Sequence, residues 1–405
     1  MATSKPLKPL VLKACQGVRN DVPAEGMTLN AEGVDLVVGA NVDLDDRGGV
    51  SRRNGYVLAV AGTDMHSLFA TADGTQALVI DGTNIKRVTN NGATVTTIGS
   101  GLTAGARMSY WEHQKRVYHC NGINNGVFEG GAVRNWGVRR PADPALAATG
   151  GPLPAGRYAV ALTFVCNDGS ESGAGPGSDI ELAAAGGIAV NLTASTNARV
   201  THINIYCTTP DGGAFYRAGT VANASQVYTI AAPPALLQSP LITQHFDKPP
   251  VGHLVAIYRG RAYVAVGDLL HWSSPYGLEI FKPTDYLRMG SALRMIAPST
   301  DGMYLSSDEG TFWAGGVDPD KFTLLRVGEP ALPGSVTYAK SSLVTELAGD
   351  IQIPVWLAGE GVCIGAPGGQ LSVVNKKWRA SDAASGAGLI RAAGDTYQYL
   401  VSTGA

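Results

Sequence analysis

Charged residues are scarce in this 405-residue chain, in which Asp, Glu, Lys and Arg together make up 16%. The formal net charge is −2, so there is no overall positive field that could hold a phosphate backbone by counterion release. Tight nucleic-acid binding is therefore not expected. The low charge accompanies 52 Gly and 22 Pro, a composition typical of short strands joined by tight turns rather than of long helices. We predict an all-β protein.

Cysteine is sparse and widely spaced, and no C-x-x-C pair occurs among Cys15, Cys120, Cys166, Cys207 and Cys363. This spacing argues against a zinc site and against a dense disulfide framework, and favours reduced, buried thiols. Cys166 and Cys207 could still face each other within one module, which the sequence leaves open.

Long apolar runs are absent as well. The N-terminus lacks an apolar stretch long enough for a signal peptide, and no later stretch is long enough to cross a bilayer. We therefore predict no membrane-spanning segment and synthesis in a cytoplasm. The sequons at Asn191 and Asn223 are then chance matches, because glycosylation needs a secretory route.

What is present is a recurring unit: a short apolar strand, a Gly-rich turn, and a second strand with an aromatic or bulky apolar residue. Copies begin at Ala77, Val117, Ala262, Met303 and Val362. Several successive copies start about 40 residues apart, the length of a four-stranded propeller blade. We predict a β-propeller of about five to six blades. The last apolar run, Tyr397 to Val401, could share a blade with N-terminal strands such as Val34 to Val38, which would leave no exposed sheet edge.

The gap between the copies at Val117 and Ala262 exceeds one period by roughly 100 residues, the size of an inserted domain. Proline-rich stretches flank it, from Pro141 to Pro154 and from Pro233 to Pro250. These limits predict three regions. Residues 1–140 hold N-terminal strands and the first blades, residues 141–250 hold the insertion with its linkers, and residues 251–405 hold the remaining blades.

Within the insertion, the stretch from Arg157 to Val165 alternates as a half-buried strand does, and the turn Asn167-Asp168-Gly169 follows it. Further short strands divided by Gly, Asn and Pro predict a small antiparallel β-sandwich. Four pieces resemble fibronectin type III-like modules found in phage tail and cell-surface proteins: Pro154-Ala155-Gly156-x-Tyr158, Asp168-Gly169-x-Glu171-Ser172, the strand from Val200 to Tyr206, and Phe215-Tyr216. The resemblance implies an immunoglobulin/fibronectin-like fold and no activity.

The sharpest short motif is Ser306-x-Asp308-x-Gly310-x-x-Trp313, which resembles the Asp-box of sialidases and many other propellers. The resemblance implies a structural hairpin in which Ser and Asp satisfy turn backbone groups and Trp packs between blades. A sialidase would also need arginines for a carboxylate, a Tyr nucleophile and an acidic partner. The residues that could fill these roles are Tyr304, Tyr338, Arg294 and Arg326. Their spacing does not relate them to one another, so no enzyme is predicted.

No catalytic, cofactor-binding or metal-ligating residues are predicted. The acidic stretch from Asp43 to Gly49 has EF-hand-like spacing, but the expected Glu is absent and Ser51 to Asn54 follow, so turn chemistry is favoured over calcium. The Gly-rich run from Gly169 to Gly177 has no Lys in a P-loop position. Single histidines in strand-like sequence are usually satisfied or solvent-exposed, and here these are His113, His119 and His202.

The stretch from Gly39 to Tyr56 contains an Asn-bearing strand, an acidic turn and an Arg-Arg-x-Gly-Tyr segment. It resembles the N-terminal signature of tail nozzle and tail-hub proteins of short-tailed bacteriophages, many of which are considerably longer. The alternative is an ordinary hairpin with Asp46 to Gly49 as its turn and with Arg52 and Arg53 on a solvated strand.

The family resemblance implies a structural virion protein of the tail. It would form a homo-oligomeric ring, a hexamer, below the portal and head-to-tail adaptor proteins, and genomic DNA would pass through the channel without specific binding. The sandwich would hold a tail fibre or another tail protein. The alternative from another class is a carbohydrate-binding or sialidase-like propeller with an accessory sandwich module, which should present a pocket of aromatic and carboxylate residues.

Overall fold

The computed structural model describes residues 15–19, 22–23, 34–39, 42–45, 48–53, 55, 57–234, 239–344, 350–374, 383–393 and 396–404. These residues are nearly all in strands and turns, so the predicted all-β class is confirmed. The α-helix of this described part, α1 (Ser341–Val344), has four residues. None of its helices is long and apolar enough to span a membrane. By its internal contacts the chain divides into two compact units, Gly62–Met289 and Met1–Ala61 with Gly290–Ala405.

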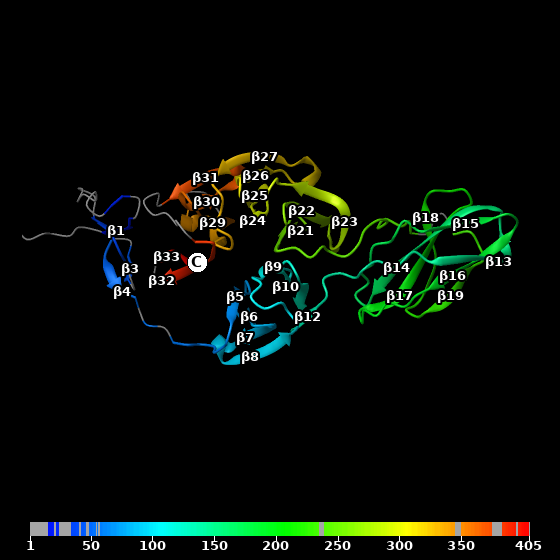
Figure 1. Cartoon of the computed structure of the whole chain (residues 1–405), viewed down its shortest axis with the longest axis horizontal. Coiled ribbons are helices and arrows are strands. Elements are labelled where there is room, and N and C mark those ends of the chain that lie inside the picture. The colour runs from blue at the N-terminus through cyan, green and yellow to red at the C-terminus, as the bar shows by residue number, and fades with distance from the viewer. Residues whose placement is uncertain are drawn as a thin grey trace, which may run out of the picture. The chain divides into compact units, whose positions relative to one another are not determined.

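The unit Gly62–Met289 contains three four-stranded antiparallel sheets whose strands follow one another in chain order (Figure 1). Tight turns join neighbouring strands, and Gly82 (φ 60°) and Gly267 (φ 61°) supply the left-handed conformation that two of these turns require. The strands are β5 (Met65–Ala70), β6 (Gln76–Asp81), β7 (Asn84–Thr89), β8 (Thr94–Gly99); β9 (Ser109–His113), β10 (Arg116–Cys120), β11 (Asn125–Glu129), β12 (Ala132–Arg134); and β20 (Leu254–Tyr258), β21 (Arg261–Val266), β22 (Leu269–Ser274), β23 (Gly277–Arg288).

In its described residues, the other unit contains two sheets of the same kind and three two-stranded pieces. The sheets are β24 (Leu293–Pro298), β25 (Gly302–Ser307), β26 (Gly310–Gly315), β27 (Thr323–Gly328) and β28 (Thr337–Lys340), β29 (Gln352–Ala358), β30 (Gly361–Gly365), β31 (Leu371–Val374). The two-stranded pieces are the hairpin of β32 (Ser385–Ala393) and β33 (Thr396–Gly404), the hairpin of β3 (Val42–Leu44) and β4 (Val50–Arg52), and the parallel pair of β1 (Cys15–Val18) and β2 (Val34–Leu36).

The expected pairing of the last strand with an N-terminal strand is not the one observed. Strand β33 pairs with β32, and β2 pairs with β1. The hairpin connection from Ala393 to Thr396 is short, so β32 meets β33 at a much lower loop-closure cost than a strand from the far end of the chain would. The link between the two ends of the chain is made by side chains instead, and it is described below.

Within each unit, neighbouring four-stranded sheets share buried cores. Strand β10 shows why, because its side chains alternate between two faces. On one face Val117 packs with Leu78 and Ile85 of the sheet β5–β8. On the other face Tyr118 packs with Val255 of the sheet β20–β23. A sheet that buries both faces needs a nearly continuous apolar strand, as the burial of Val117 to Cys120 shows.

The recurring sequence unit corresponds to one position in these sheets. Its first four copies form the two middle strands of a sheet, namely β6–β7, β10–β11, β21–β22 and β25–β26. The fifth copy, which begins at Val362, forms β30 and β31, the third and fourth strands. The fifth copy is therefore shifted by one strand relative to the others. The reason is that glycines occur in both turns that flank β30: Gly359 in the turn before it, and Gly368 and Gly369 in the turn after it.

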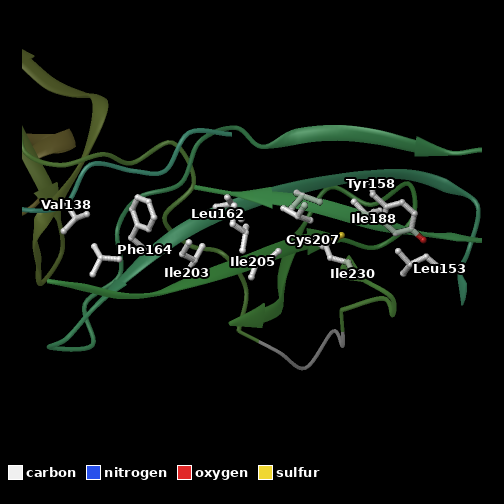
Figure 2. Packing of buried hydrophobic residues seen from close by; sticks show 14 of the residues in the cluster. Val138, Leu153, Tyr158, Leu162, Phe164, Ile188, Ile203, Ile205, Cys207 and Ile230 are labelled. Carbon is white, nitrogen blue, oxygen red and sulfur yellow. The ribbon is translucent and has the colours of Figure 1, made fainter. Parts of the chain in front are cut away.

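Between β12 and β20 the chain forms a unit of two sheets, which we call the insert. Its strands are β13 (Ala145–Leu153), β14 (Gly156–Cys166), β15 (Ser178–Leu182), β16 (Gly186–Leu192), β17 (Val200–Thr208), β18 (Phe215–Ala222) and β19 (Gln226–Ile230). One sheet has the order β13-β16-β19 and the other the order β15-β14-β17-β18. Alternate residues of β14, among them Tyr158, Leu162 and Phe164, point into the core that the two sheets share (Figure 2).

The two cysteines of the insert do not meet, although both lie in its core. Cys166 is opposite Val200, whereas Cys207 is opposite Val160, six residues earlier on β14. Six residues of strand span about 20 Å, far beyond the Cα separation of about 7 Å that a disulfide tolerates. All five cysteines are free thiols.

Replacing Tyr158 with Phe is expected to lower the free energy of unfolding of the insert by about 1 kcal/mol. The ring of Tyr158 is fully buried, and its hydroxyl donates a hydrogen bond to the Pro154 carbonyl at 2.9 Å. Urea denaturation of the full chain measures the loss. The matched control is Tyr228→Phe, which removes a 3.2 Å bond from a less buried hydroxyl and should cost less. Equal losses in the two variants would contradict the expectation.

Candidate functional site

The Asp-box motif forms the hairpin between β25 and β26, with Asp308 and Glu309 as its two-residue turn. Gly310 has φ 140°, which favours glycine. Trp313 packs against Tyr304 with ring centroids 4.8 Å apart, and both share a core with Trp356 of β29. The hairpin and the packing of Trp between neighbouring sheets, which the resemblance implies, are both observed.

The resemblance implies that both Ser306 and Asp308 bind backbone groups of the turn, but the structure shows this for Ser306 and not for Asp308. The Ser306 hydroxyl donates to the carbonyl of Gly310, beside the turn, at 3.3 Å, and it also accepts the Ala331 N–H at 2.8 Å. The Asp308 carboxylate instead binds the guanidinium of Arg294. The Glu309 N–H in the turn donates to the Ser307 hydroxyl at 3.2 Å. A neighbouring arginine therefore replaces the turn backbone as the partner of the aspartate.

The four residues considered for a sialidase do not converge on one another. Arg294 is paired with Asp308, and Arg326 donates to the Glu309 carbonyl at 3.2 Å. The Tyr304 hydroxyl donates to the carbonyls of Ala366 and Gln370 at 2.5 and 2.9 Å, and burial raises the pKa of Tyr304.

Burial also raises the pKa of Tyr338 on β28. Both phenols are thus held neutral in the protein interior, which is the opposite of what an activated nucleophile requires.

The acidic stretch near the N-terminus uses its carboxylates for structure. Asp43 accepts hydrogen bonds from Arg53 at 3.1 Å and from Arg391 of β32 at 3.0 Å, and the bond from Arg391 is the main cause that lowers the pKa of Asp43. Asp45 accepts the Gly49 N–H at 2.5 Å, which is turn chemistry. Asn41, Asp46, Arg47, Asn54 and Tyr56 of the family signature lie outside the described residues.

The expectation for the single histidines is wrong for His119. His202 is exposed, with Nδ1 2.9 Å from the Thr201 hydroxyl, and His113 is half-buried. His119, however, is 1% exposed, and neither ring nitrogen has a hydrogen-bond partner in the part of the chain that the structure describes. Burial lowers the pKa of His119 from 6.5 to about 4, so the ring is neutral at physiological pH.

A polar cavity of about 290 Å³ lies on the outer face of the sheet β15-β14-β17-β18. It forms because His202 and Asn204 occupy alternate positions of β17 that point away from the core, while the loop after β14 returns over them. The lining residues are Val165, Gly169, Glu171, His202, Asn204, Arg217 and Thr220.

Glu171 is the most constrained group of this cavity. Its Oε1 accepts hydrogen bonds from the hydroxyl of Thr163, from Asn204 Nδ2 at 2.9 Å and from the Tyr206 hydroxyl at 2.8 Å. Burial and the Glu171 carboxylate both raise the pKa of Tyr206, so this phenol remains a donor. The Thr220 hydroxyl donates to Asn204 Oδ1 at 2.6 Å and so orients the amide toward the carboxylate.

A ladder of alternating charges joins the base of the insert to the sheets β20–β23 and β9–β12. Glu279 of β23 accepts from Arg199 at 2.8 Å and from Arg134 of β12 at 2.7 Å. Arg199 also binds Asp168 at 2.8 Å, and Glu129 binds Arg134 at 2.9 Å. Across the described ranges, no three His, Cys, Asp or Glu side chains gather closely enough to hold a metal ion.

Sequence reasoning did not identify the cavity or the ladder. In the sequence, Glu171 belongs to the fibronectin-like resemblance and His202 is an isolated histidine, and neither feature predicts a cavity. One signal was available: His202, Asn204 and Tyr206 alternate with the apolar Ile203 and Ile205, which predicts a polar outward face. The ladder has no such signal, since Arg199 and Glu279 are far apart in the sequence.

No protein-family model and no curated protein sequence matches the chain. Solved structures match weakly. BBS1N, solved in complex with ARL6DN, has a TM-score of 0.33 at 8% identity and covers 84% of this chain and 89% of its own. AztD of Citrobacter koseri has a TM-score of 0.27 at 10% identity, over 76% of this chain and 84% of its own. The N-terminal domain of Nup159 has a TM-score of 0.27 at 12% identity, over 84% and 72%. Likenesses as low as these assign neither a fold nor a function to the chain.

Proposed function

We propose that the chain is a non-enzymatic structural protein of a short-tailed bacteriophage tail, which forms a ring that continues the DNA ejection channel below the portal and the head-to-tail adaptor. One observation carries the proposal. The tail-hub-like segment is anchored by Asp43, which binds Arg53 of the same segment and Arg391 of β32. In an ordinary surface hairpin, Arg53 would face solvent and contribute little to stability. Here, the ion pair between Asp43 and Arg391 joins the segment to the C-terminal hairpin β32–β33.

The proposal includes a β-propeller of about five to six blades. Five four-stranded sheets with strands in chain order, which share buried cores with their neighbours inside each unit, support it. The hairpin β32–β33 packs on the sheet β28–β31 through Ile390 and Tyr399. We assign this hairpin to a further, incomplete blade.

We further propose that the insert is an immunoglobulin/fibronectin-like sandwich that projects to hold a tail fibre or another tail protein. Sheets of three and four strands around one core support this assignment. The charge ladder at its base supports a rigid arm rather than a tethered module, because Arg199 and Glu279 are largely withdrawn from solvent, with 13% and 17% of their side chains exposed.

The proposed protein is not an enzyme, and the geometry around the Asp-box supports this part of the proposal. Tyr304 and Tyr338 are buried and neutral, and Arg294 and Arg326 are engaged with the hairpin turn. The net charge of −2 supports passage of DNA without specific binding.

Native mass spectrometry of the purified full chain, followed by negative-stain imaging, tests the ring. We expect a closed species of about six copies. Arg391→Ala removes one of the two arginines on Asp43 and is expected to reduce the ring fraction. Arg157→Ala, which removes an exposed arginine of the insert paired with Asp179, is the matched control and should leave the ring fraction unchanged. A strict monomer at high protein concentration, with no rings in the images, would count against the proposal.

A further inference from the structure

We propose that the polar cavity of the insert binds a neutral, polyhydroxylated ligand of about the size of one saccharide unit. The site lies on the outer face of the sheet β15-β14-β17-β18 and goes beyond the ring function, on which it does not depend. Its recognition groups would be the Glu171 carboxylate, the Arg217 guanidinium and the His202 imidazole.

The acceptor of the site is held in place before any ligand arrives. Thr163, Asn204 and Tyr206 are all buried, and each donates a hydrogen bond to the same oxygen of Glu171, Oε1. The second oxygen, Oε2, has no partner among the described residues, so it is available to a ligand. A carboxylate fixed by three donors loses little conformational entropy on binding, which favours affinity.

Among the described residues, the basic groups of the site are not fixed by several hydrogen bonds in this way. Within the described part of the chain, the Arg217 guanidinium forms no ion pair, although Arg217 and Glu171 line the same cavity. His202 is exposed, and in the described ranges its Nδ1 alone lies within hydrogen-bond distance of a protein group, the Thr201 hydroxyl. An acidic and a basic group that share a cavity without touching leave room for a ligand that bridges them. Such a ligand must offer both donors and acceptors.

The charge balance selects a neutral ligand. A phosphate or sulfate would meet a single arginine and would be repelled by the Glu171 carboxylate. A divalent cation would find a single carboxylate and would be repelled by Arg217, and it prefers several oxygen ligands. A sugar hydroxyl suits both groups, because it can donate to Glu171 Oε2 and accept from Arg217.

The size and lining of the cavity agree with one sugar ring. Its volume of about 290 Å³ is close to the lower limit of small-molecule sites, about 300 Å³. Val165 and Gly169 supply an apolar edge against which the C–H face of a ring can pack.

The test uses the full-length protein and a panel of neutral monosaccharides: glucose, galactose, mannose, rhamnose and N-acetylglucosamine. Saturation-transfer NMR at up to about 10 mM sugar detects sites with dissociation constants near 1 mM. We expect at least one sugar to bind. Arg217→Ala and Glu171→Gln should each weaken that binding at least about tenfold, which corresponds to the loss of one charge-assisted hydrogen bond. Arg157→Ala, on β14 of the same sheet, should leave it unchanged.

Circular dichroism of each variant separates loss of the site from loss of the fold. Arg217→Ala removes a side chain that forms no hydrogen bond or ion pair with another side chain among the described residues, so the variant should keep the native spectrum. Three results would overturn the proposal. No monosaccharide binds, or the sugar binds Arg217→Ala as tightly as the unchanged chain, or inorganic phosphate or Ca²⁺ binds with a dependence on Arg217 or Glu171 while the sugars do not.

Discussion

Replacing Glu279 with alanine is expected to lower the free energy of opening at the base of the insert by about 2 to 3 kcal/mol. Glu279 is the central acceptor of the charge ladder, bound by Arg199 and Arg134. Alanine would leave these two guanidinium groups, whose side chains are 13% and 18% exposed, with one acceptor fewer each. Removing one partner of a buried ion pair costs about 3 to 5 kcal/mol, and residual solvent access reduces that cost here.

Native-state hydrogen exchange measures this opening at two specific amides. Asp247, in the segment that leaves the insert, and Phe281 of β23 each donate their N–H to the other's carbonyl at 2.8 Å. Both amides should exchange faster in Glu279→Ala by the factor that corresponds to the lost stability, about 30-fold or more.

Asp179→Ala is the matched control for the ladder. It breaks the ion pair of Asp179 with Arg157, in which the side chains are 55% and 68% exposed, and exposed pairs contribute about 0 to 1 kcal/mol. Exchange at Asp247 and Phe281 should stay unchanged in this variant. If Glu279→Ala also left the two amides unchanged, the ladder would not hold the base of the insert.

The β-architecture could be predicted from the sequence because its causes are local. A run such as Ala77 to Ile80, followed by Gly82 with a left-handed backbone, defines both a strand and the turn after it. In β14 the alternation of Tyr158, Val160 and Leu162 with smaller residues identifies the core face. Each of these signals lies within about ten residues, the span over which backbone geometry and side-chain period act.

The charge ladder and the N-terminal pairing could not be predicted, because their partners are distant in the chain. Arg199 and Glu279 are 80 residues apart, and Arg134 and Glu279 are 145 apart. Any of the 33 acidic residues could have been the partner of either arginine on sequence grounds. The choice depends on which loops the insert and the sheet β20–β23 bring together. That is a property of tertiary packing, which carries no local signature.

The cavity is an intermediate case. The outward face of β17 could be read from the alternation of His202, Asn204 and Tyr206 with apolar residues. The arrival of Glu171 over that face could not, because it depends on how the loop after β14 turns back. The sequence therefore predicts a polar surface on β17. The position of the Glu171 carboxylate, which makes this surface a candidate site, is known from the structure alone.

Acidification is expected to destabilise the unit Gly62–Met289 through His119, by about 3 kcal/mol between about pH 7 and about pH 4. The pKa of His119 is about 4 in the folded chain and 6.5 in the unfolded chain. Between these values the unfolded state binds a proton that the folded state does not, so stability falls as the pH decreases through this window. Above pH 6.5 the contribution is fully present, and below about pH 4 it is lost and no longer changes.

The physical cause is the position of His119 between two sheets. The ring lies opposite Tyr110 on β9, and Gly126 on β11 leaves the space that the imidazole occupies. Protonation would place a charge there with no acceptor for either N–H among the described residues. Opening of the sheets is the remaining way to hydrate that charge.

Urea denaturation of the full chain, followed by tryptophan fluorescence at several pH values from about 7 to about 4.5, measures the effect. His119→Leu should remove this pH dependence and should be at least as stable as the unchanged chain at neutral pH, because it eliminates two unpaired buried nitrogens. His113 and His271, whose pKa values burial also lowers, remain in both proteins. The difference between the two curves therefore isolates His119. Parallel curves would show that the imidazole is hydrated or paired in the folded chain.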